Sequence, residues 1–278
     1  MLMTFVRNLL SDPAGRTGVV ILALFGAASL VAPLLAALLP GQGAVTPLAP
    51  PSSGHPLGTN DIGEDILTHL LLGCRHSLIV GLATGFFSVI LSLAAGIGSA
   101  LRPRVLDKIL MRLADALIAL PSLLFFILIA AYVRPSTWTL ILLFSLFSWQ
   151  YGARLIRNQT LVLLSQGHIV ASRSFGGSLG YIARRHLIPE LFPILLVGFV
   201  MRTRFAILAE AGLTFIGIGD PLLPSLGKTI STCLGFLFLP VWVWWLLPAG
   251  LALSALVTGL TLLGFSLEKR FLGRVDHA

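Results

Sequence analysis

Beyond Glu190 at its start, three charged side chains interrupt an otherwise apolar stretch of this 278-residue chain, at positions 190–214. They are Arg202, Arg204 and Glu210. If the stretch is a helix in a bilayer, an arginine near its centre costs about 2.5–3.5 kcal/mol, so an idle guanidinium that faces lipid is not expected. Such a group can attract a solute that bears a carboxylate, or it can form a structural ion pair with an acid elsewhere. Both interpretations stay open at this point.

Helical geometry separates these three side chains. Arg202 and Arg204 are two positions apart, about 200° around a helix of 3.6 residues per turn, so they cannot share one face. Arg202 and Glu210 differ by about 80° on the same geometry and can line one side. The arginines therefore need not have the same partners.

Residues suited to catalysis or metal binding are not grouped in the sequence. The six histidines are scattered, and Cys74 and Cys233 are too few for a disulfide framework. There is no P-loop pattern, and Gly217-Ile-Gly219 is too short a glycine pattern for a dinucleotide loop. We therefore expect no enzymatic activity in this chain and no catalytic, cofactor-binding or metal-binding residues.

Composition places these residues in a membrane protein. Hydrophobic residues make up 56% of the chain and charged residues 11%, whereas a soluble domain has about 25% charged residues. A span needs about 20 apolar residues. We predict an all-α membrane protein with a tail at 1–17 and a single transmembrane domain at 18–278. The six predicted transmembrane helices lie at about 18–39, 76–101, 109–133, 135–157, 190–214 and 241–266.

The distribution of positive charge predicts the orientation. Six spans place both termini on one side, and that side receives fourteen of the nineteen Lys and Arg residues, against three on the other. Because cytoplasmic loops carry the excess of Lys and Arg, we predict cytoplasmic termini, a cytoplasmic loop at 158–189 and an outer loop at 40–75. This bias also accounts for the net charge of +8 without nucleic acid as a partner.

The predicted cytoplasmic loop contains a polar stretch, 168–189, with a pattern of its own. We predict two short helices in it, at 167–175 and 178–188, separated by a backbone conformation at Gly176 that glycine tolerates best. Small side chains on the first helix leave a surface that another protein can approach closely. An ordinary basic loop is the alternative. The small residues and glycines of the pattern are Ala171, Ser172, Gly176 and Gly177.

The outer loop contains a second compact pattern. It reads His55-Pro-Leu-Gly-Thr-Asn60-Asp-Ile-Gly-Glu-Asp65 and is followed by Gly73-Cys-Arg75-His-Ser77-Leu78. One interpretation is a capped turn, in which Thr59 or Asn60 caps a helix that starts near Asp61. A second interpretation, compatible with the first, is a surface on which another protein docks.

Taken together, the patterns resemble those of a known family. The stretch at 168–189 resembles the EAA loop of binding-protein-dependent ABC importer permeases, with Val170 where the family usually has Glu and Ser172 in place of its second Ala. The outer pattern resembles the signature of the dipeptide, oligopeptide and nickel permeases, with Asn60 for Asp and Glu64 for Arg. Residues 210–219 and 224–227 resemble two further blocks of that family, with Leu226 in place of Trp.

The resemblance implies a type I ABC importer permease fold, of the second-permease subunit type, with a coupling-helix loop between helices 4 and 5. The residues implied to couple to an ATPase are Ala171, Ser172, Arg173, Phe175, Gly176 and Gly177. The residues implied to face a binding protein are His55, Gly58, Thr59, Asp61 and Asp65. Arg202, Arg204 and Glu210 are candidates for the translocation path on their own merits, because the arginine pair is not part of the family pattern.

The resemblance also implies partners and a location. The chain would form half of a path for di- or oligopeptides or a nickel chelate, in the plasma (inner) membrane of a prokaryote. It would assemble with a second permease, two ATPase subunits that bind ATP and Mg, and an extracytoplasmic solute-binding protein. A proton-coupled secondary transporter or channel is the alternative, but that class usually has several acids or histidines within its spans, and Glu210 is the only acid well inside a predicted span.

Overall fold

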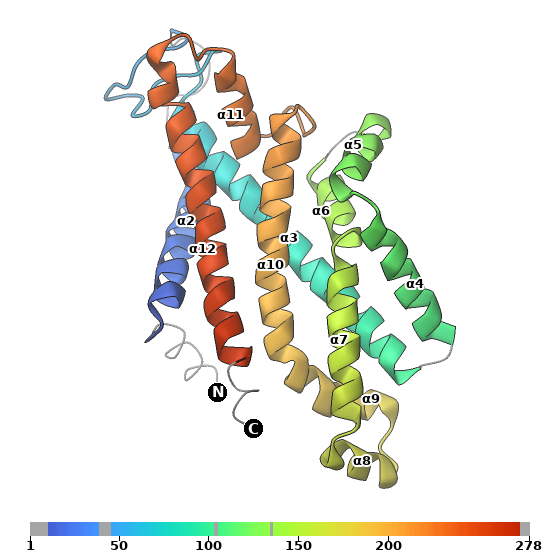
Figure 1. The fold of residues 1–278 in the computed structure, drawn as a ribbon. Coiled ribbons are helices and arrows are strands. Elements are labelled where there is room, and N and C mark those ends of the chain that lie inside the picture. The colour runs from blue at the N-terminus through green and yellow to red at the C-terminus, as the bar shows by residue number, and fades with distance from the viewer. Residues whose placement is uncertain (1–10, 39–45, 103–104, 134–135, 273–278) are drawn as a thin grey trace.

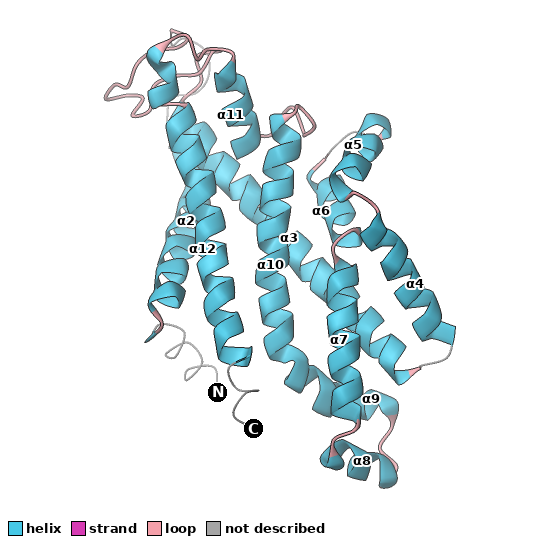
Figure 2. Ribbon diagram, viewed as in Figure 1, coloured by secondary structure: helices cyan, strands magenta, loops and turns pink. Residues whose placement is uncertain are grey.

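The computed structural model describes residues 11–38, 46–102, 105–133 and 136–272. Within these ranges, helices are the only regular structure apart from one isolated β-bridge between Thr59 and Asp65. Long helices run side by side, with α8 and α9 at one end and the loops near α11 at the other (Figures 1 and 2). The helices are α2 (Pro13–Leu38), α3 (Ile66–Leu101), α4 (Val105–Ala119), α5 (Ser122–Tyr132), α6 (Thr137–Leu146), α7 (Trp149–Leu164), α8 (Gly167–Ser174), α9 (Leu179–Ile182), a π-helical turn (Ala183–Leu187), α10 (Ile188–Phe215), α11 (Leu226–Leu234), a 3₁₀ turn (Pro240–Val243) and α12 (Leu246–Leu272).

Among the described residues, four helical stretches are long and apolar enough to cross a membrane, and up to six if each of two bent pairs counts as one span. The four contain α2, α3, α10 and α12. The bent pairs are α4 with α5, at 88°, and α6 with α7, at 40°. The described part of the chain is thus an all-helical membrane fold with four to six candidate spans.

The third predicted span, 109–133, is therefore not one straight helix. The chain turns at Leu120 and Pro121, between the end of α4 and the start of α5. Proline has no backbone N–H to donate, and its ring disfavours a helical conformation at the preceding residue. The bend is the physical consequence.

Several predicted boundaries also need correction. The outer loop, predicted at 40–75, ends at Asp65, because the Asp65 side chain caps α3 by accepting a hydrogen bond from Thr68 N. The predicted coupling loop, 158–189, begins later, because α7 continues to Leu164. The last helix begins at Leu246, after the 3₁₀ turn, and not at 241.

Glycines in α3 allow its neighbours to approach closely, and α3 packs most extensively against α7 and α10. A Cβ atom on Gly81 would lie 2.7 Å from Ile207 Cγ1, in α10. One on Gly96 would lie 2.7 Å from Ile156 Cγ2, in α7. Small residues at such crossings are typical of helix packing in membranes.

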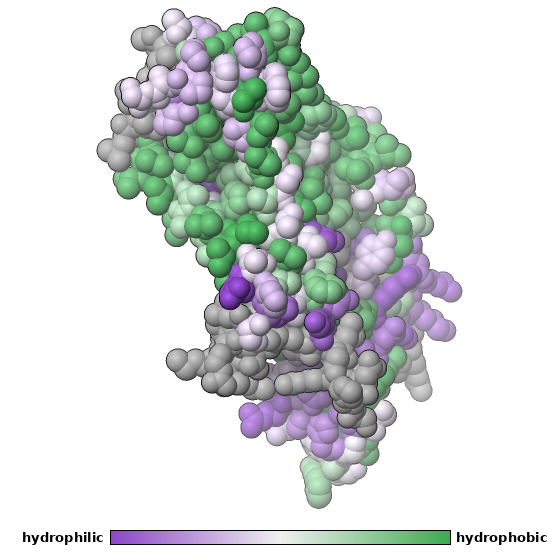
Figure 3. Space-filling model, turned by 60° about the vertical axis from the view of Figure 1, so that its left-hand side comes forward, coloured by the Kyte–Doolittle hydropathy of each residue, from purple (hydrophilic) through white to green (hydrophobic). Residues whose placement is uncertain are grey.

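The surface is divided along the long axis of the molecule. Figure 3 shows hydrophobic residues over much of the middle of one face, and strongly hydrophilic residues gathered toward the lower end. That lower end carries α8 and α9 in Figure 1, and the first residues of α2 and the last of α12 point the same way. An apolar band with a charged end is the pattern that a bilayer imposes.

Candidate functional site

The α8–α9 segment is anchored by aliphatic residues. Ile169, on α8, is fully buried and belongs to one apolar cluster with Ile182, Leu187 and Leu191. On the same helix, His168 Nε2 lies 3.1 Å from Glu190 Oε1, at the start of α10. These contacts hold α8 against the end of the long helix α10.

The glycines after α8 close a tight turn. Gly176 has φ of +85°, as predicted from the sequence, and Gly177 N donates to Ser172 O at 2.9 Å. A Cβ atom on Gly177 would lie 2.7 Å from that same carbonyl oxygen. Gly176 is therefore required for its backbone conformation and Gly177 for space.

The outer face of this segment is open. Ala171, Arg173 and Phe175 are exposed, and Ser172 is partly buried. Phe175 is 92% exposed, the largest exposure of any bulky apolar residue in the described part of the chain. The candidate coupling residues thus form one projecting surface, whose aromatic tip is left exposed by the described part of the chain.

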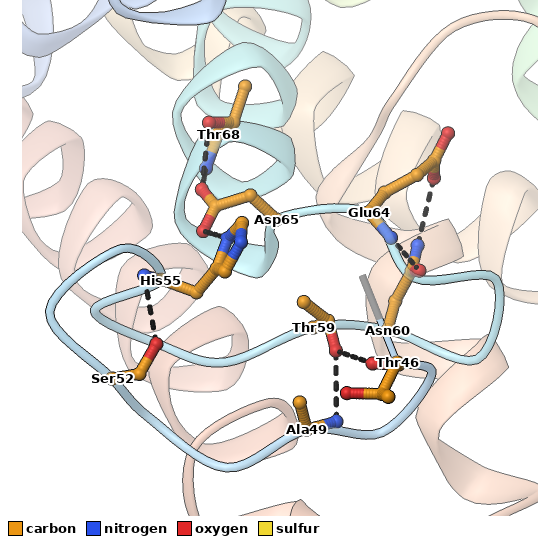
Figure 4. A network of polar contacts seen from close by, with 9 residues as sticks. All are labelled: Thr46, Ala49, Ser52, His55, Thr59, Asn60, Glu64, Asp65 and Thr68. Carbon is orange, nitrogen blue, oxygen red and sulfur yellow. Dashed lines mark hydrogen bonds and ion pairs between the residues drawn. The ribbon is translucent and has the colours of Figure 1, made fainter. Parts of the chain in front are cut away.

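The outer loop is organised around buried Thr59 (Figure 4). Its hydroxyl donates to Thr46 O at 2.8 Å and accepts from Ala49 N at 2.9 Å. These bonds join the segment around Thr59 to the earlier segment of the loop at 46–49. Gly58 has φ of +71°, and a Cβ atom there would collide with Ala49 O and lie 3.2 Å from the Trp244 ring. Both residues therefore shape the loop from inside.

Asp65 links this loop to α3. Its Oδ2 accepts from both the amide and the hydroxyl of Thr68, at 2.8 Å each, and its Oδ1 lies 3.1 Å from His55 Nδ1 (Figure 4). A capping carboxylate satisfies amide groups that the first helical turn leaves free. His55 and Asp65 are thus brought together, ten residues apart in the sequence, at the start of α3.

The prediction that a helix starts near Asp61 is wrong. Asn60 Oδ1 accepts from the amides of Ile62 and Glu64, which closes a turn, and Gly63 follows with φ of +83°. A left-handed residue ends helical propagation. Asn60 does cap, as its residue type suggested, but it caps a turn before the helix.

Only some of the residues predicted to face a binding protein are accessible at the surface of the outer loop. Gly58 and Thr59 are buried, Asp61 is partly exposed, and the neighbouring Ile62 is 67% exposed. Beside them, a hollow of about 210 Å³ lies between the loop and α11 and is lined by polar residues such as Glu64 and by apolar ones such as Ile66 and Trp245. The turn at Asp61 and Ile62, together with exposed Pro56, is thus open to another protein.

Arg202 lies at the break between α6 and α7. Its Nε donates to Ser148 O at 3.1 Å, and its Nη1 donates to Gly198 O at 3.0 Å. Ser148 is the N-cap residue of α7, and the next carbonyl, Trp149 O, accepts a hydrogen bond from Ser92 Oγ at 2.8 Å. Arg202 therefore has a structural task within its own chain.

Arg204 and Glu210 reach other helices. Arg204 Nη1 donates to Thr261 Oγ1, on α12, at 3.3 Å. Glu210 is fully buried and accepts from Ser77 Oγ, on α3, at 2.7 Å, while its other oxygen lies 3.6 Å from His76 Nδ1. Within the described residues, no ion pair joins either arginine to an acid. The three path candidates are therefore not one cluster.

Sequence reasoning missed the partners of these groups. Ser77, Ser88 and Ser92 lie at helical spacing within α3, and each makes a buried hydrogen bond to another helix or to the α6–α7 break. That spacing was a usable signal, because polar residues in a span usually face protein. Nothing in the sequence marks Ser148, whose importance depends on where a helix breaks.

Comparisons with known proteins agree with this architecture. Residues 88–275 match the family model described as "Binding-protein-dependent transport system inner membrane component". A protein of Brucella suis biovar 1 (strain 1330), named as a peptide permease, is 32% identical over 228 residues, which cover 81% of this chain and 75% of that protein.

Two further relatives extend the match. A Brucella abortus biovar 1 (strain 9-941) protein, named as a peptide transport system permease, is 33% identical over 267 residues, or 94% of this chain and 88% of its own. The oligopeptide transport system permease protein OppC of Bacillus subtilis (strain 168) is 33% identical over 172 residues, or 62% of this chain and 56% of its own. The chain thus belongs to the family of inner-membrane permease components of binding-protein-dependent ABC importers.

Proposed function

We propose that this chain is one of two permease subunits of an ATP-driven importer and forms half of the path for di- or oligopeptides or a nickel chelate. An extracytoplasmic binding protein would deliver the solute. Two ATPase subunits would bind ATP and Mg and carry out the hydrolysis. The names of the relatives, which refer to peptides, favour peptides over nickel.

One observation supports coupling most directly: Phe175 projects from the tip of α8 with 92% of its surface exposed. The helix α8 stands at the hydrophilic end of the molecule, away from the apolar band that lipid would cover (Figures 1 and 3). An exposed aromatic side chain on a rigidly anchored helix suits insertion into a cleft of a partner. The excess of positive charge at this end favours a cytoplasmic location, where an ATPase would be.

The experiment is a Phe175→Asp substitution in the complete transporter. We expect the variant to reach the membrane at the normal level, but to retain the ATPase at least about tenfold less well on purification and to lose uptake, because a hot-spot aromatic contact contributes about 2 kcal/mol or more.

Leu222→Asp is the matched control, since Leu222 is also highly exposed, at 89%, but lies in the loop that precedes α11. It should retain the ATPase. Equal ATPase recovery with Phe175→Asp and with the unmodified chain would contradict coupling through α8. A chain that couples normally but imports neither peptide nor nickel chelate would contradict the proposed solutes alone.

A further inference from the structure

The α4–α5 bend and the α6–α7 break face a common hollow. It has a volume of about 360 Å³ and is lined from the bend by Leu120 and Ser122, from the break by Ser148 and Gln150, and from α10 by Arg202. Figure 1 shows these elements on one side of the molecule, with α4 to α7 forming a group beside α10. Interrupted helices at membrane depth are tolerated where they are buried in protein or line a cavity, and transporters often bind solute at such interruptions.

Gln150 lines this hollow and has a buried acceptor atom without a partner in the described part of the chain. The side chain is only 3% exposed, and its Nε2 donates to Phe147 O at 2.8 Å. That bond orients the amide, so Oε1 is the free end, and it has no hydrogen-bond partner in the described part of the chain. A buried acceptor left unpaired costs about 1–3 kcal/mol, so an arriving donor gains from meeting it.

Arg202 supplies the opposite chemistry. Its guanidinium donates hydrogen bonds to two backbone carbonyls. Among the described residues no carboxylate is paired with it, so its positive charge is not neutralised by an acid. The hollow therefore offers an acceptor for an N–H group and a cation for a carbonyl or carboxylate oxygen. A purely anionic chelate would satisfy only the second of these.

We infer that this hollow is a subsite for the main chain of a peptide, in which a peptide N–H donates to Gln150 Oε1 and a peptide carbonyl or C-terminal carboxylate accepts from Arg202. The inference rests on the proposed function and specifies its substrate class. It assigns Gln150 a task in recognition that is separate from its bond to the α6–α7 break.

The test is uptake of trialanine and of trialanine N-methylated at one internal amide, by the complete transporter in proteoliposomes with its binding protein. The two N-methylated isomers differ in which amide carries the methyl group. For the unmodified chain we expect uptake of the more strongly affected isomer to be about tenfold lower than that of trialanine, which corresponds to about 1.4 kcal/mol. In Gln150→Leu, uptake of trialanine itself should fall by a similar factor. N-methylation of the peptide should then cause no further fall in uptake, because the acceptor that the amide would meet is absent. For each chain we take the ratio of trialanine uptake to uptake of the N-methylated peptide, and we compare this ratio between the unmodified chain and the variant. The binding protein is the same in both measurements, so its own preference cancels in that comparison.

Gln159→Leu is the matched control, because it is the same substitution at an exposed position of the same helix. It should discriminate between the peptides as the unmodified chain does. If Gln150→Leu gave the same uptake ratio for the two peptides as the unmodified chain, the inference would be overturned, but the proposal of peptide import would stand. Absence of trialanine uptake by the unmodified chain, with import of a nickel chelate, would refute both the peptide proposal and the subsite.

A second measurement leaves Gln150 unchanged. A cysteine replacing Ser122, in a background without Cys74 and Cys233, should react with a small thiol reagent more slowly when trialanine is being transported. The N-methylated isomer should protect less. Equal alkylation with and without trialanine would overturn the subsite, even if Gln150→Leu fails to assemble.

Discussion

The outer loop holds its shape with side-chain hydrogen bonds, whereas the α8–α9 segment holds its position with buried aliphatic residues. In the outer loop, Thr59, Asn60 and Asp65 bond to backbone groups of the same loop or of the first turn of α3. In the α8–α9 segment, Ile169 and its apolar neighbours are buried, and the patterned polar residues face outward. Two sequence patterns of similar appearance thus have opposite uses.

The difference teaches how to interpret such a pattern. Where a short polar pattern contains residues that can satisfy each other's backbone groups, it specifies a shape, and most of its members are unavailable to a partner. Where it consists of small residues, glycines and one aromatic, it specifies a surface. Substitutions should therefore damage stability in the first region and assembly in the second.

The largest effect is expected for Gly58→Val in the outer loop. Valine would need a left-handed conformation, at about 1–2 kcal/mol, and its Cβ would collide with Ala49 O. We expect a severe loss of folded protein in the membrane, measured by its yield and melting temperature after purification. Gly54→Val is the control, because nothing lies within 4 Å of a Cβ atom there. Equal yields of both variants would show that the loop does not depend on its glycine.

The next effect separates assembly from folding. Gly176→Val and Ala171→Asp change the exposed turn and face of α8, where a Cβ atom on Gly176 meets nothing within 4 Å. We expect normal amounts of protein in the membrane but loss of ATPase binding and of uptake. Gly180→Ala, in the open and without positive φ, should behave normally. Normal uptake in both test variants would reduce the α8–α9 segment to a connector.

A smaller effect is expected for Thr59→Val, which removes the hydroxyl that joins Thr46 O and Ala49 N. Leaving buried groups unpaired costs about 1–3 kcal/mol, so the melting temperature should fall by several degrees. Thr59→Ser keeps the hydroxyl and should be close to the unmodified chain. If valine and serine are equally stable, the hydrogen bonds are not what holds the loop.

The mildest change tests only sidedness. Single cysteines at Ser53 and Ser178, in a background without Cys74 and Cys233, place the new thiol at an exposed position in each case. An impermeant thiol reagent added to intact cells should label the cysteine at 53 and not the one at 178. Since both are exposed, the difference reports the side of the membrane rather than burial. The reverse pattern would overturn the proposed orientation.

The sequence predicted what depends on local chemistry. The positive φ at Gly176 followed from a glycine pair after a short helical segment, and an all-helical membrane fold followed from uncharged runs long enough to span a bilayer. The start of α3 was misplaced because Asn60 and Asp65 are both good capping residues. Only the three-dimensional turn at Gly63 decides between them.

The long-range partners could not be predicted in this way. Arg202 donates to Ser148 O, 54 positions earlier, at the break where α6 ends at Leu146 and α7 begins at Trp149. Hydropathy does not mark such a break, since the residues on both sides are apolar. The 88° bend at Pro121 was likewise hidden, because proline shows where a helix is interrupted but not how far the chain turns.

The unbroken length of α3 has a mechanical consequence. Its 36 residues, from Ile66 to Leu101, make a rod about 54 Å long that crosses the molecule obliquely from the outer-loop end toward the opposite end (Figure 1). Close packing at Gly81, near the middle of α3, and at Gly96, near its far end, ties the rod to α10 and α7, so the three helices would tilt together. A tilt of roughly one degree about the midpoint moves each tip by about 0.5 Å, in opposite directions. Displacement at the Asp65 cap is therefore felt at the far tip without any hinge between them.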